Sequence, residues 1–505
     1  MADRSPHTKR TIVIVGGGTA GWMAAAALTR FAPNFSVILV ESETIGTVGV
    51  GEATIPQIRL FNAGLGIDEG EFLRETKATF KLGIAFDGWL REGESYMHAF
   101  GLIGRAHGPL PFHQIWARAR SEGFARPTRN YSLNEIAARA LRMQAGRQDM
   151  PYAYHFDAGL YAAFLRRYAE TRGARRVEGI VAAVDRDGES GDIAAVKLQS
   201  GERIEGDFFI DCSGFRALLI EGALEAGFED WSHLLPCDRA MAVPCANGGD
   251  FTPYTRSIAR SAGWQWRIPL QHRIGNGLVY SSAHMGDDEA AALLLANLDG
   301  APDGDPRPIR FTTGMRKRQW QGNCLALGLA AGFMEPLEST SIHLVQSALS
   351  RFLAMLPAGP ADPAIRDEFN RQAAFEWTRI RDFLMLHYWA NAREGEPFWD
   401  AMRALDLPET LRGKIEQWKA SAFIHREHEE LFTEPGWFQV FAGQGIEPAG
   451  YNPIADTLTR EQIIALFENH ERGAISAVNA MPMHADAVAG MLGAAQRQDS
   501  KENAA

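Results

Sequence analysis

The stretch TIVIVGGGTAGWMAAAALTRFAPNFSVILVE, residues 11–41, decides the fold of the amino-terminal part of the chain. Residues 11–15 are apolar and mostly β-branched, as in a strand buried on both faces of a parallel sheet. Residues 22–28 are mostly strong helix formers, and residues 36–40 are a second β-branched run that ends at Glu41. Strand, glycine-rich turn, helix, strand and acid in this order predict the opening of a dinucleotide-binding βαβ unit.

The glycine-rich turn carries the residues that such a unit needs. Gly16 permits the tight turn, Gly18 lets the backbone approach a pyrophosphate, and Gly21 lets the helix pack closely on the strand. The helix N-terminus supplies N–H groups and a positive dipole end, and Glu41 stands where an acid binds ribose hydroxyls. A purely structural glycine loop is the alternative. The predicted cofactor-binding residues here are Gly16, Gly18, Thr19, Ala20, Gly21 and Glu41.

The rest of the chain predicts an α/β protein. Residues 210–215 resemble the strand–Asp–small–Gly segment that closes FAD sites in flavin monooxygenases, and residues 325–332 resemble the segment leading to the flavin ring, so we expect FAD. Further elements are predicted as a helix at 159–168, strands at 177–184 and 194–198, a sheet within 240–320, a helix at 342–356 and mostly helix over 360–475. The domains we expect are an FAD-binding and catalytic module at 1–350 with insertions near 80–150 and 240–320, a helical substrate-binding part at 351–485 and a disordered tail at 486–505.

Composition excludes several classes of protein. With 51 Lys+Arg against 62 Asp+Glu the formal charge is −11, which argues against broad nucleic-acid binding. The four cysteines form no CxxC pair, so we expect no disulfide scaffold, structural zinc or iron–sulfur cluster. No apolar run reaches the length of a membrane span, and we expect a soluble, cytoplasmic protein.

Four motifs further along the chain resemble flavin-dependent halogenases of the tryptophan-halogenase branch. Residues 263–269 (GWQWRIP) carry WxWxIP, and the others are 50–56 (VGEATIP), 79–83 (TFKLG) and 335–340 (EPLEST). The matches extend from about residue 11 to 455. The resemblance implies a Rossmann-type FAD-binding domain of the flavin monooxygenase kind, with an added sheet and a largely helical C-terminal substrate-binding part.

The resemblance also implies a reaction. A separate NAD(P)H-dependent flavin reductase supplies FADH2, and with O2 a halide, chloride or bromide, becomes hypohalous acid. The oxidant passes through an internal tunnel to Lys81, which presents it to an electron-rich ring, while Glu338 polarises it or removes the ring proton. An ammonium can hydrogen-bond hypohalous acid, and a neutral amine can form a haloamine. A lysine in this apolar run could instead face solvent.

Other site residues follow from the same resemblance. Thr340 and Ser341 lie at a predicted helix start and are expected to hold the halide, although many relatives have Gly where this chain has Ser341. Trp264 and Trp266 alternate on one strand face, with plain aromatic core as the alternative reading. The remaining cofactor contacts expected are Val50, Ala53, Val181, Leu329 and Ile342, and the tunnel residues are Trp264, Trp266, Ile268 and Pro269.

The expected substrate pocket departs from the family pattern. Where free-tryptophan halogenases carry a tyrosine pair for the amino-acid end, this chain has Trp437 and Phe438, which offer no phenolic hydroxyl. The substrate expected is therefore indole, an indole derivative or another arene without a zwitterionic tail. The substrate residues predicted are His98, Phe100, Ser339, Trp437 and Phe438, whereas His113 is taken as structural. A flavin-dependent hydroxylase and a non-catalytic flavoprotein that binds an indole are the alternatives, and a homodimer would be unsurprising.

Overall fold

The computed structural model describes residues 9–46, 52–249, 251–360 and 362–502. The chain divides into two compact units. The first unit is Met1–Lys77, Phe156–His233 and Phe311–Trp377, and the second is Ala78–His155, Leu234–Arg310 and Thr378–Ala505. Residues 78–155 and 234–310 thus group with the C-terminal residues 378–505 in the second unit.

A six-stranded sheet forms the centre of the first unit, in the order β21-β22-β12-β1-β2-β8. All neighbours are parallel except β21 and β22. Ile12, Val13 and Ile14 have no exposed surface, as expected for a central strand. The strands are β1 (Arg10–Val15), β2 (Phe35–Glu41), β8 (Arg175–Glu178), β12 (Phe208–Asp211), β21 (Trp320–Gln321) and β22 (Cys324–Ala326).

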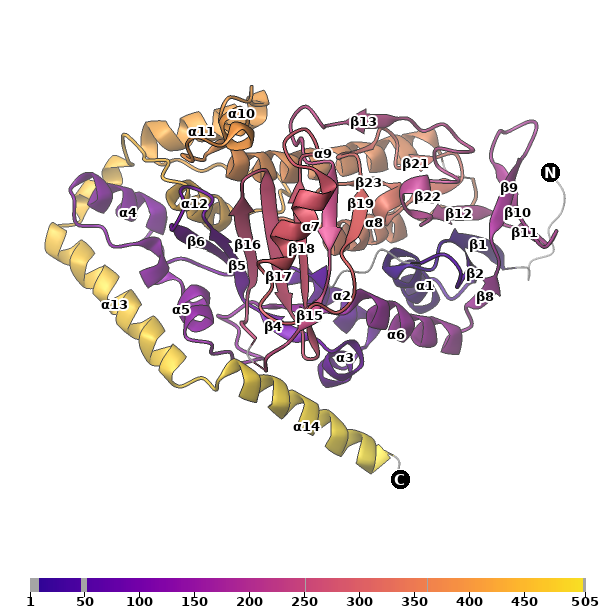
Figure 1. The fold of residues 1–505 in the computed structure, drawn as a ribbon, viewed down its shortest axis with the longest axis horizontal. Helices are drawn as coiled ribbons and strands as arrows, with labels where there is room; N and C mark the ends of the chain where they lie inside the picture. Colours follow the sequence, from indigo (N-terminus) through magenta and orange to yellow (C-terminus); the bar gives the residue numbers. More distant parts are fainter. Residues whose placement is uncertain (1–8, 47–51, 250, 361, 503–505) are drawn as a thin grey trace. The chain divides into compact units, whose positions relative to one another are not determined.

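Helices pack around this sheet, and α1 contacts both α6 and α8 (Figure 1). The buried alanine run at residues 24–27 of α1 allows close helix approach, so the predicted βαβ unit is confirmed. The helices are α1 (Thr19–Phe31), α2 (Gln57–Leu65), α3 (Glu69–Thr76), α6 (Ala158–Thr171) and α8 (Ser341–Ala354).

One predicted strand of the first unit is wrong. The run at 177–184 is divided between β8 and β9 (Val181–Arg186), which belong to different sheets. The chain breaks around Gly179, where an added Cβ would lie 2.7 Å from Leu198. Strands β9, β10 (Ile193–Leu198) and β11 (Arg203–Glu205) form a separate antiparallel sheet.

The second unit contains an eight-stranded sheet, which confirms the sheet expected within 240–320. Its path is β19-β14-β18-β17-β16-β5-β6, with β15 paired to β18. A short ladder of β4 (Thr79–Lys81) with residues 153–155 of β7 (Ala153–Phe156) lies in the same unit. The strands of the larger sheet are β5 (Gly83–Asp87), β6 (Ser95–Ala99), β14 (Arg239–Ala242), β15 (Cys245–Ala246), β16 (Thr255–Arg260), β17 (Gly263–Pro269), β18 (Arg273–Tyr280) and β19 (Arg307–Arg310).

The C-terminal part is helical, as expected. Residues 486–502, predicted to be disordered, continue α14, which His484 and Val488 anchor with 1% and 3% exposure. Within the described ranges no helix has the length and apolarity to cross a bilayer. The helices are α4 (Phe112–Ser121), α5 (Leu133–Arg139), α7 (Asp287–Leu295), α9 (Pro363–Trp389), α10 (Pro397–Arg403), α11 (Glu409–Ser421), α12 (Glu434–Gly443), α13 (Arg460–Asn479) and α14 (His484–Glu502).

Candidate active site

The carboxyl ends of the parallel strands in the first unit define one candidate site. The glycine turn follows β1, the short helix Gly214–Arg216 follows β12, and the short helix Gly328–Ala330 follows β22. Because β1, β12 and β22 run in one direction, these three loops emerge at the same edge of the sheet. Ligands of open α/β sheets bind at this edge.

Asp211 fixes the loop after β12. Its buried carboxylate accepts hydrogen bonds from the Ser213 hydroxyl at 2.6 Å and from the Leu219 and Ile220 amides, both at 2.8 Å. A buried charge is tolerated when its oxygens are satisfied in this way. The strand–Asp–Ser–Gly segment therefore has a definite shape at the sheet edge.

The glycines leave a cradle that side chains would fill. Gly16 has φ +116°, and a Cβ there would lie 2.1 Å from the Cys212 carbonyl oxygen. A Cβ on Gly21 would lie 1.9 Å from the Gly16 oxygen. Gly18, at the N-terminus of α1, has no described atom within 4 Å of such a Cβ. The turn therefore packs tightly on the protein at Gly16 and Gly21 and leaves open space at Gly18. This space at the helix N-terminus fits a pyrophosphate.

Glu41 lies against the same turn, since a Cβ on Gly17 would be 1.4 Å from its Oε2 atom. The other carboxylate oxygen accepts a 2.6 Å hydrogen bond from Arg176, and the Arg166 guanidinium is 3.7 Å away. Neither arginine stands in a recognisable motif; Arg176 lies on β8 and Arg166 on α6. These groups fit the phosphates and ribose of a dinucleotide such as FAD.

The other predicted cofactor contacts are spread around the first unit. Leu329 lies in the turn after β22, where a Cβ on Gly328 would be 2.9 Å from Ala20. Ala53 is buried in the short strand β3 (Glu52–Ala53), and Val181 begins β9. Val50 lies outside the described residues.

A tight turn brings Glu338 to the start of α8. The Ser339 amide donates to the Pro336 carbonyl at 3.0 Å, and Ser339 has φ +59°, a strained value for a residue other than glycine. Glu338, Ser339 and Thr340 are each at most 2% exposed. Thr340 is the N-cap residue, but its side chain makes no capping hydrogen bond to the described part of α8. The Thr340 side chain therefore does not satisfy the first N–H groups of α8.

Lys81 lies inside the second unit with no exposed surface, as expected. It ends β4 opposite Ala153, and its Nζ atom is 5.4 Å from the centre of the Phe100 ring. The Leu82 amide donates to the Pro253 carbonyl, and the Leu82 carbonyl accepts from the Phe100 amide. The backbone after Lys81 is therefore held on both sides.

The WxWxIP strand is β17, at the centre of the larger sheet. Trp264 and Trp266 are 1% and 4% exposed, with ring centres 6.2 Å apart, so both are buried on one face. Ile268 is also buried, and the Pro269 carbonyl accepts a 2.7 Å hydrogen bond from the Thr79 hydroxyl. This bond ties the end of the motif to the strand that carries Lys81.

The predicted substrate residues of the second unit fall into two groups. His98 contacts the Phe383 and Phe432 rings at 5.5 and 5.9 Å, and Trp437 meets Phe383 edge-on at 4.8 Å. Phe100 directly follows β6, and its ring lies 5.4 Å from the Lys81 Nζ atom. Phe438 instead packs on His113, Trp116 and Trp418, so it is not brought to this cluster. The sequence analysis missed Phe383 and Phe432, because no motif marks them.

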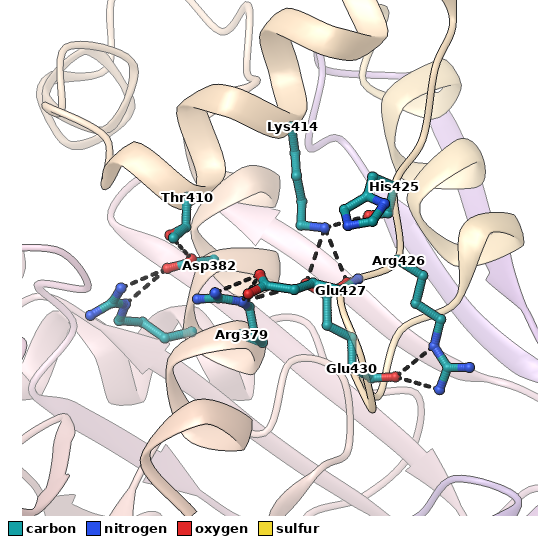
Figure 2. Close-up of polar contacts among 9 residues, drawn as sticks. Arg379, Asp382, Thr410, Lys414, His425, Arg426, Glu427 and Glu430 are labelled. Atoms are coloured by element: carbon teal, nitrogen blue, oxygen red, sulfur yellow. Dashed lines mark hydrogen bonds and ion pairs between the residues drawn. The ribbon is translucent and has the colours of Figure 1, made fainter. Parts of the chain in front are cut away.

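An ionic cluster orders the segment between α11 and α12 that carries Phe432 (Figure 2). Lys414 contacts Glu430 at 3.0 Å, and Arg379 contacts Glu427 at 2.6 Å. Lys414 also lies 5.1 Å from the centre of the Trp437 ring. Glu430 is 2% exposed, so breaking its pairing would leave a buried charge. The cluster thus connects the aromatic wall, formed by His98, Phe383, Phe432 and Trp437, to α9 and α11.

Buried histidines predict a pH dependence of stability. Burial lowers the pKa of His113 and of His484 to about 4, from the ordinary value of 6.5. Below about pH 6.5 these two histidines bind protons in the unfolded chain but stay neutral in the folded chain. The free energy of unfolding is therefore highest above pH 6.5 and decreases as the pH falls toward 4. We expect roughly 2 kcal/mol lost per histidine between about pH 7.5 and about pH 5, measured by urea unfolding.

The control for this prediction is His484→Gln, which keeps an acceptor for the Phe80 amide that bonds His484 at 3.2 Å. This variant should lose less stability on acidification than the unchanged chain. Equal losses in both would contradict the assignment.

The fold and the first site define a dinucleotide-binding protein of the flavin monooxygenase architecture, with a buried lysine in its second unit. A family model described as tryptophan halogenase matches residues 11–460, and the chain belongs to the tryptophan halogenase family. The expectations of a Rossmann-type fold and of a flavin-dependent halogenase are confirmed.

Similar proteins match this chain over nearly their full length. The tryptophan 6-halogenase ThaL of Streptomyces albogriseolus is 35% identical, over 96% of this chain and 99% of that protein. The solved structure of Xcc4156, a flavin-dependent halogenase from Xanthomonas campestris, is 46% identical with a TM-score of 0.93, over 94% and 97% of the two chains. BrvH, a flavin-dependent halogenase from Brevundimonas sp. BAL3, is 42% identical with a TM-score of 0.92, over 96% and 99%.

Proposed function

We propose that this enzyme uses FADH2, O2 and chloride or bromide to halogenate an electron-rich aromatic compound, indole or an indole derivative. When bound, reduced FAD supplies with O2 the two-electron oxidation that converts halide to hypohalous acid. A separate NAD(P)H-dependent flavin reductase provides the FADH2. The observation that carries the proposal is the complete burial of Lys81 beside the Phe100 ring, in a chain of this family.

Lys81 is assigned to deliver the oxidant. Its N–H groups can donate to the oxygen of hypohalous acid, which withdraws electrons from the halogen and makes it more electrophilic. The aromatic surroundings hold a flat guest by stacking and offer little water to quench the oxidant. Trp264, Trp266, Ile268 and Pro269 are assigned to the wall along which the oxidant passes.

The turn before α8 is assigned to bind the halide and to assist the halogenation of the ring. Thr340 and Ser341 hold the halide at the helix N-terminus, where the partial positive charge favours an anion. The Glu338 carboxylate polarises the oxidant or accepts the proton that leaves the ring. Ser341 brings a hydroxyl to a position where many relatives have glycine, and it shapes the halide pocket.

The substrate is proposed to lack the free amino acid, although several relatives are named as tryptophan halogenases. Trp437 is enclosed by Phe383, Phe441 and the Lys414 side chain, and Phe438 lies among aromatic rings. Neither side chain offers a hydroxyl for a carboxylate or an ammonium group. Loss of such hydrogen bonds to a charged group costs about 1.5–3 kcal/mol.

The test compares indole with tryptophan, using FAD, a flavin reductase, NADH and bromide. We expect brominated indole with kcat/KM at least about 10-fold above that for tryptophan, from the lost hydrogen bonds. A hydroxylated product that forms without halide would support a hydroxylase instead. A preference for tryptophan would contradict the assigned substrate class.

A further inference from the structure

A buried hydrogen-bond bridge lies beside Lys81 and is centred on His155. The His155 Nε2 atom is 2.9 Å from the Thr255 hydroxyl, and its Nδ1 atom is 3.2 Å from the Thr79 hydroxyl. Thr79 in turn donates to the Pro269 carbonyl at 2.7 Å. His155, Thr79 and Thr255 are at most 4% exposed. The bridge therefore joins β4, β7, β16 and the end of the WxWxIP strand in the interior.

The bridge has one direction. Since the Thr79 hydroxyl proton is used on Pro269, the Thr79 oxygen can only accept from His155, which requires the proton on Nδ1. In the neutral imidazole, Nε2 then accepts from the Thr255 hydroxyl, which defines a single tautomer. In a protonated imidazole this bond would reverse, with Nε2 donating to the Thr255 oxygen.

Strand register places this imidazole next to Lys81. Thr79 pairs with His155 and Lys81 pairs with Ala153, so all four residues lie on one face of the ladder. His155 and Lys81 are diagonal neighbours on that face, within reach of a long side chain. Ala153, directly opposite Lys81, has a small side chain, so the register leaves room on this face for both the lysine and the imidazole.

The charges around His155 keep it neutral. Burial lowers its pKa well below the ordinary value, and the positive charges of Lys81 and Arg267 lower it further. No carboxylate among the described residues opposes them in that balance. The imidazole is therefore a fixed, uncharged support beside a cation over the working pH range.

We propose that His155 is a positioning residue for Lys81: through Thr79 and Pro269 it fixes the lysine-bearing strand against the WxWxIP strand, so that Lys81 meets the oxidant in one orientation. The inference rests on the proposed function of Lys81. A merely structural histidine would support folding, whereas a positioning histidine also sets the fraction of oxidant that reaches the substrate.

The test measures that fraction. Brominated indole and free hypobromous acid, trapped with taurine, are quantified together for the full enzyme with FAD, reductase, NADH and bromide. His155→Leu, which loses both bonds, should lower the ratio of brominated indole to trapped oxidant at least about 10-fold. His155→Asn, which can keep the donor to Thr79, should recover the ratio to within about 3-fold of the unchanged enzyme.

Matched variants keep the outcome decisive. His113→Asn removes another buried histidine of the second unit and should lower stability without changing the ratio. Thr79→Val removes both the link to Pro269 and the acceptor for His155 Nδ1 while the imidazole and its Thr255 bond stay in place, and it decides the matter if His155→Leu does not fold. An unchanged ratio in folded His155→Leu, or in Thr79→Val where the former does not fold, would overturn the inference. Full delivery by a Lys81→Ala variant would instead overturn the proposed function.

Discussion

Lys81→Ala is expected to lower the bromination of indole about 10³-fold, the upper end of the effect of losing one preorganised donor. The Lys81 side chain is fully buried, and its ammonium group faces the Phe100 ring. A water molecule that replaced this ammonium in the variant would lie against an aromatic surface, so it is a poor substitute. Lys81→Met, which keeps the apolar stem, should be equally inactive. Product formation per folded molecule is measured by chromatography with FADH2 in excess.

The control for the lysine prediction is Lys197→Met on β10. Lys197 pairs with Asp185 at the surface of the first unit and is 49% exposed. Its loss should leave the rate of bromination unchanged. FAD binding, followed by fluorescence quenching, should be the same in all three variants. A Lys81→Met variant within 10-fold of the unchanged enzyme would contradict the assigned role.

Glu338→Gln is expected to lower kcat about 100-fold with little change in KM for indole, in the range that general acid–base groups contribute. The amide keeps the shape of the side chain in the strained turn at Ser339 but accepts no proton. Because the effect is on the chemical step, it should appear in kcat and in kcat/KM alike. Steady-state kinetics at saturating bromide measure both.

Glu335 offers a matched control for Glu338. It lies three residues earlier in the same segment and has the same 1% exposure. If the loss in Glu338→Gln reflects proton transfer by Glu338 and not the removal of any negative charge from this turn, Glu335→Gln should keep kcat within about 3-fold of the unchanged enzyme. A Glu338→Gln variant with full kcat would remove the acid–base role, and equal losses in both variants would point to the fold of the turn instead.

Local patterns predicted the elements around the glycine turn well. The stretch at 11–41 determines β1, the glycine turn, α1 and β2 by periodicity and backbone sterics alone. Glu41 could therefore be placed, but its partner Arg176 could not, because it lies 135 residues away on β8. The break of the 177–184 run at Gly179 was missed for the same reason, since it depends on Leu198 of another strand.

The second unit was harder to predict, because its contacts join distant segments. Phe383 and Phe432 complete the aromatic wall from α9 and from the segment before α12, and neither stands in a motif. His155 lies opposite Thr79 only through the β4–β7 register. Phe438 was assigned with its neighbour Trp437, but successive helical residues point about 100° apart, and it faces His113 instead.

Composition predicts a frayed tail after residue 485 because the segment is rich in alanine, glutamine and charged residues. The structure has helix α14 here, which begins at a buried His484 and contains several alanines, the best helix formers. The bond from the Phe80 amide to His484 anchors this helix next to the strand of Lys81.

The measurement that tests the central claim most directly separates making the oxidant from delivering it. In a single turnover with FADH2, O2 and bromide, the brominated indole and the taurine-trapped oxidant are counted for the unchanged enzyme and for Lys81→Ala. If Lys81 delivers the halogen, both enzymes oxidise the same amount of bromide, but the oxidant goes to indole in the first and to taurine in the second. Equal capture by indole in both enzymes would contradict the account.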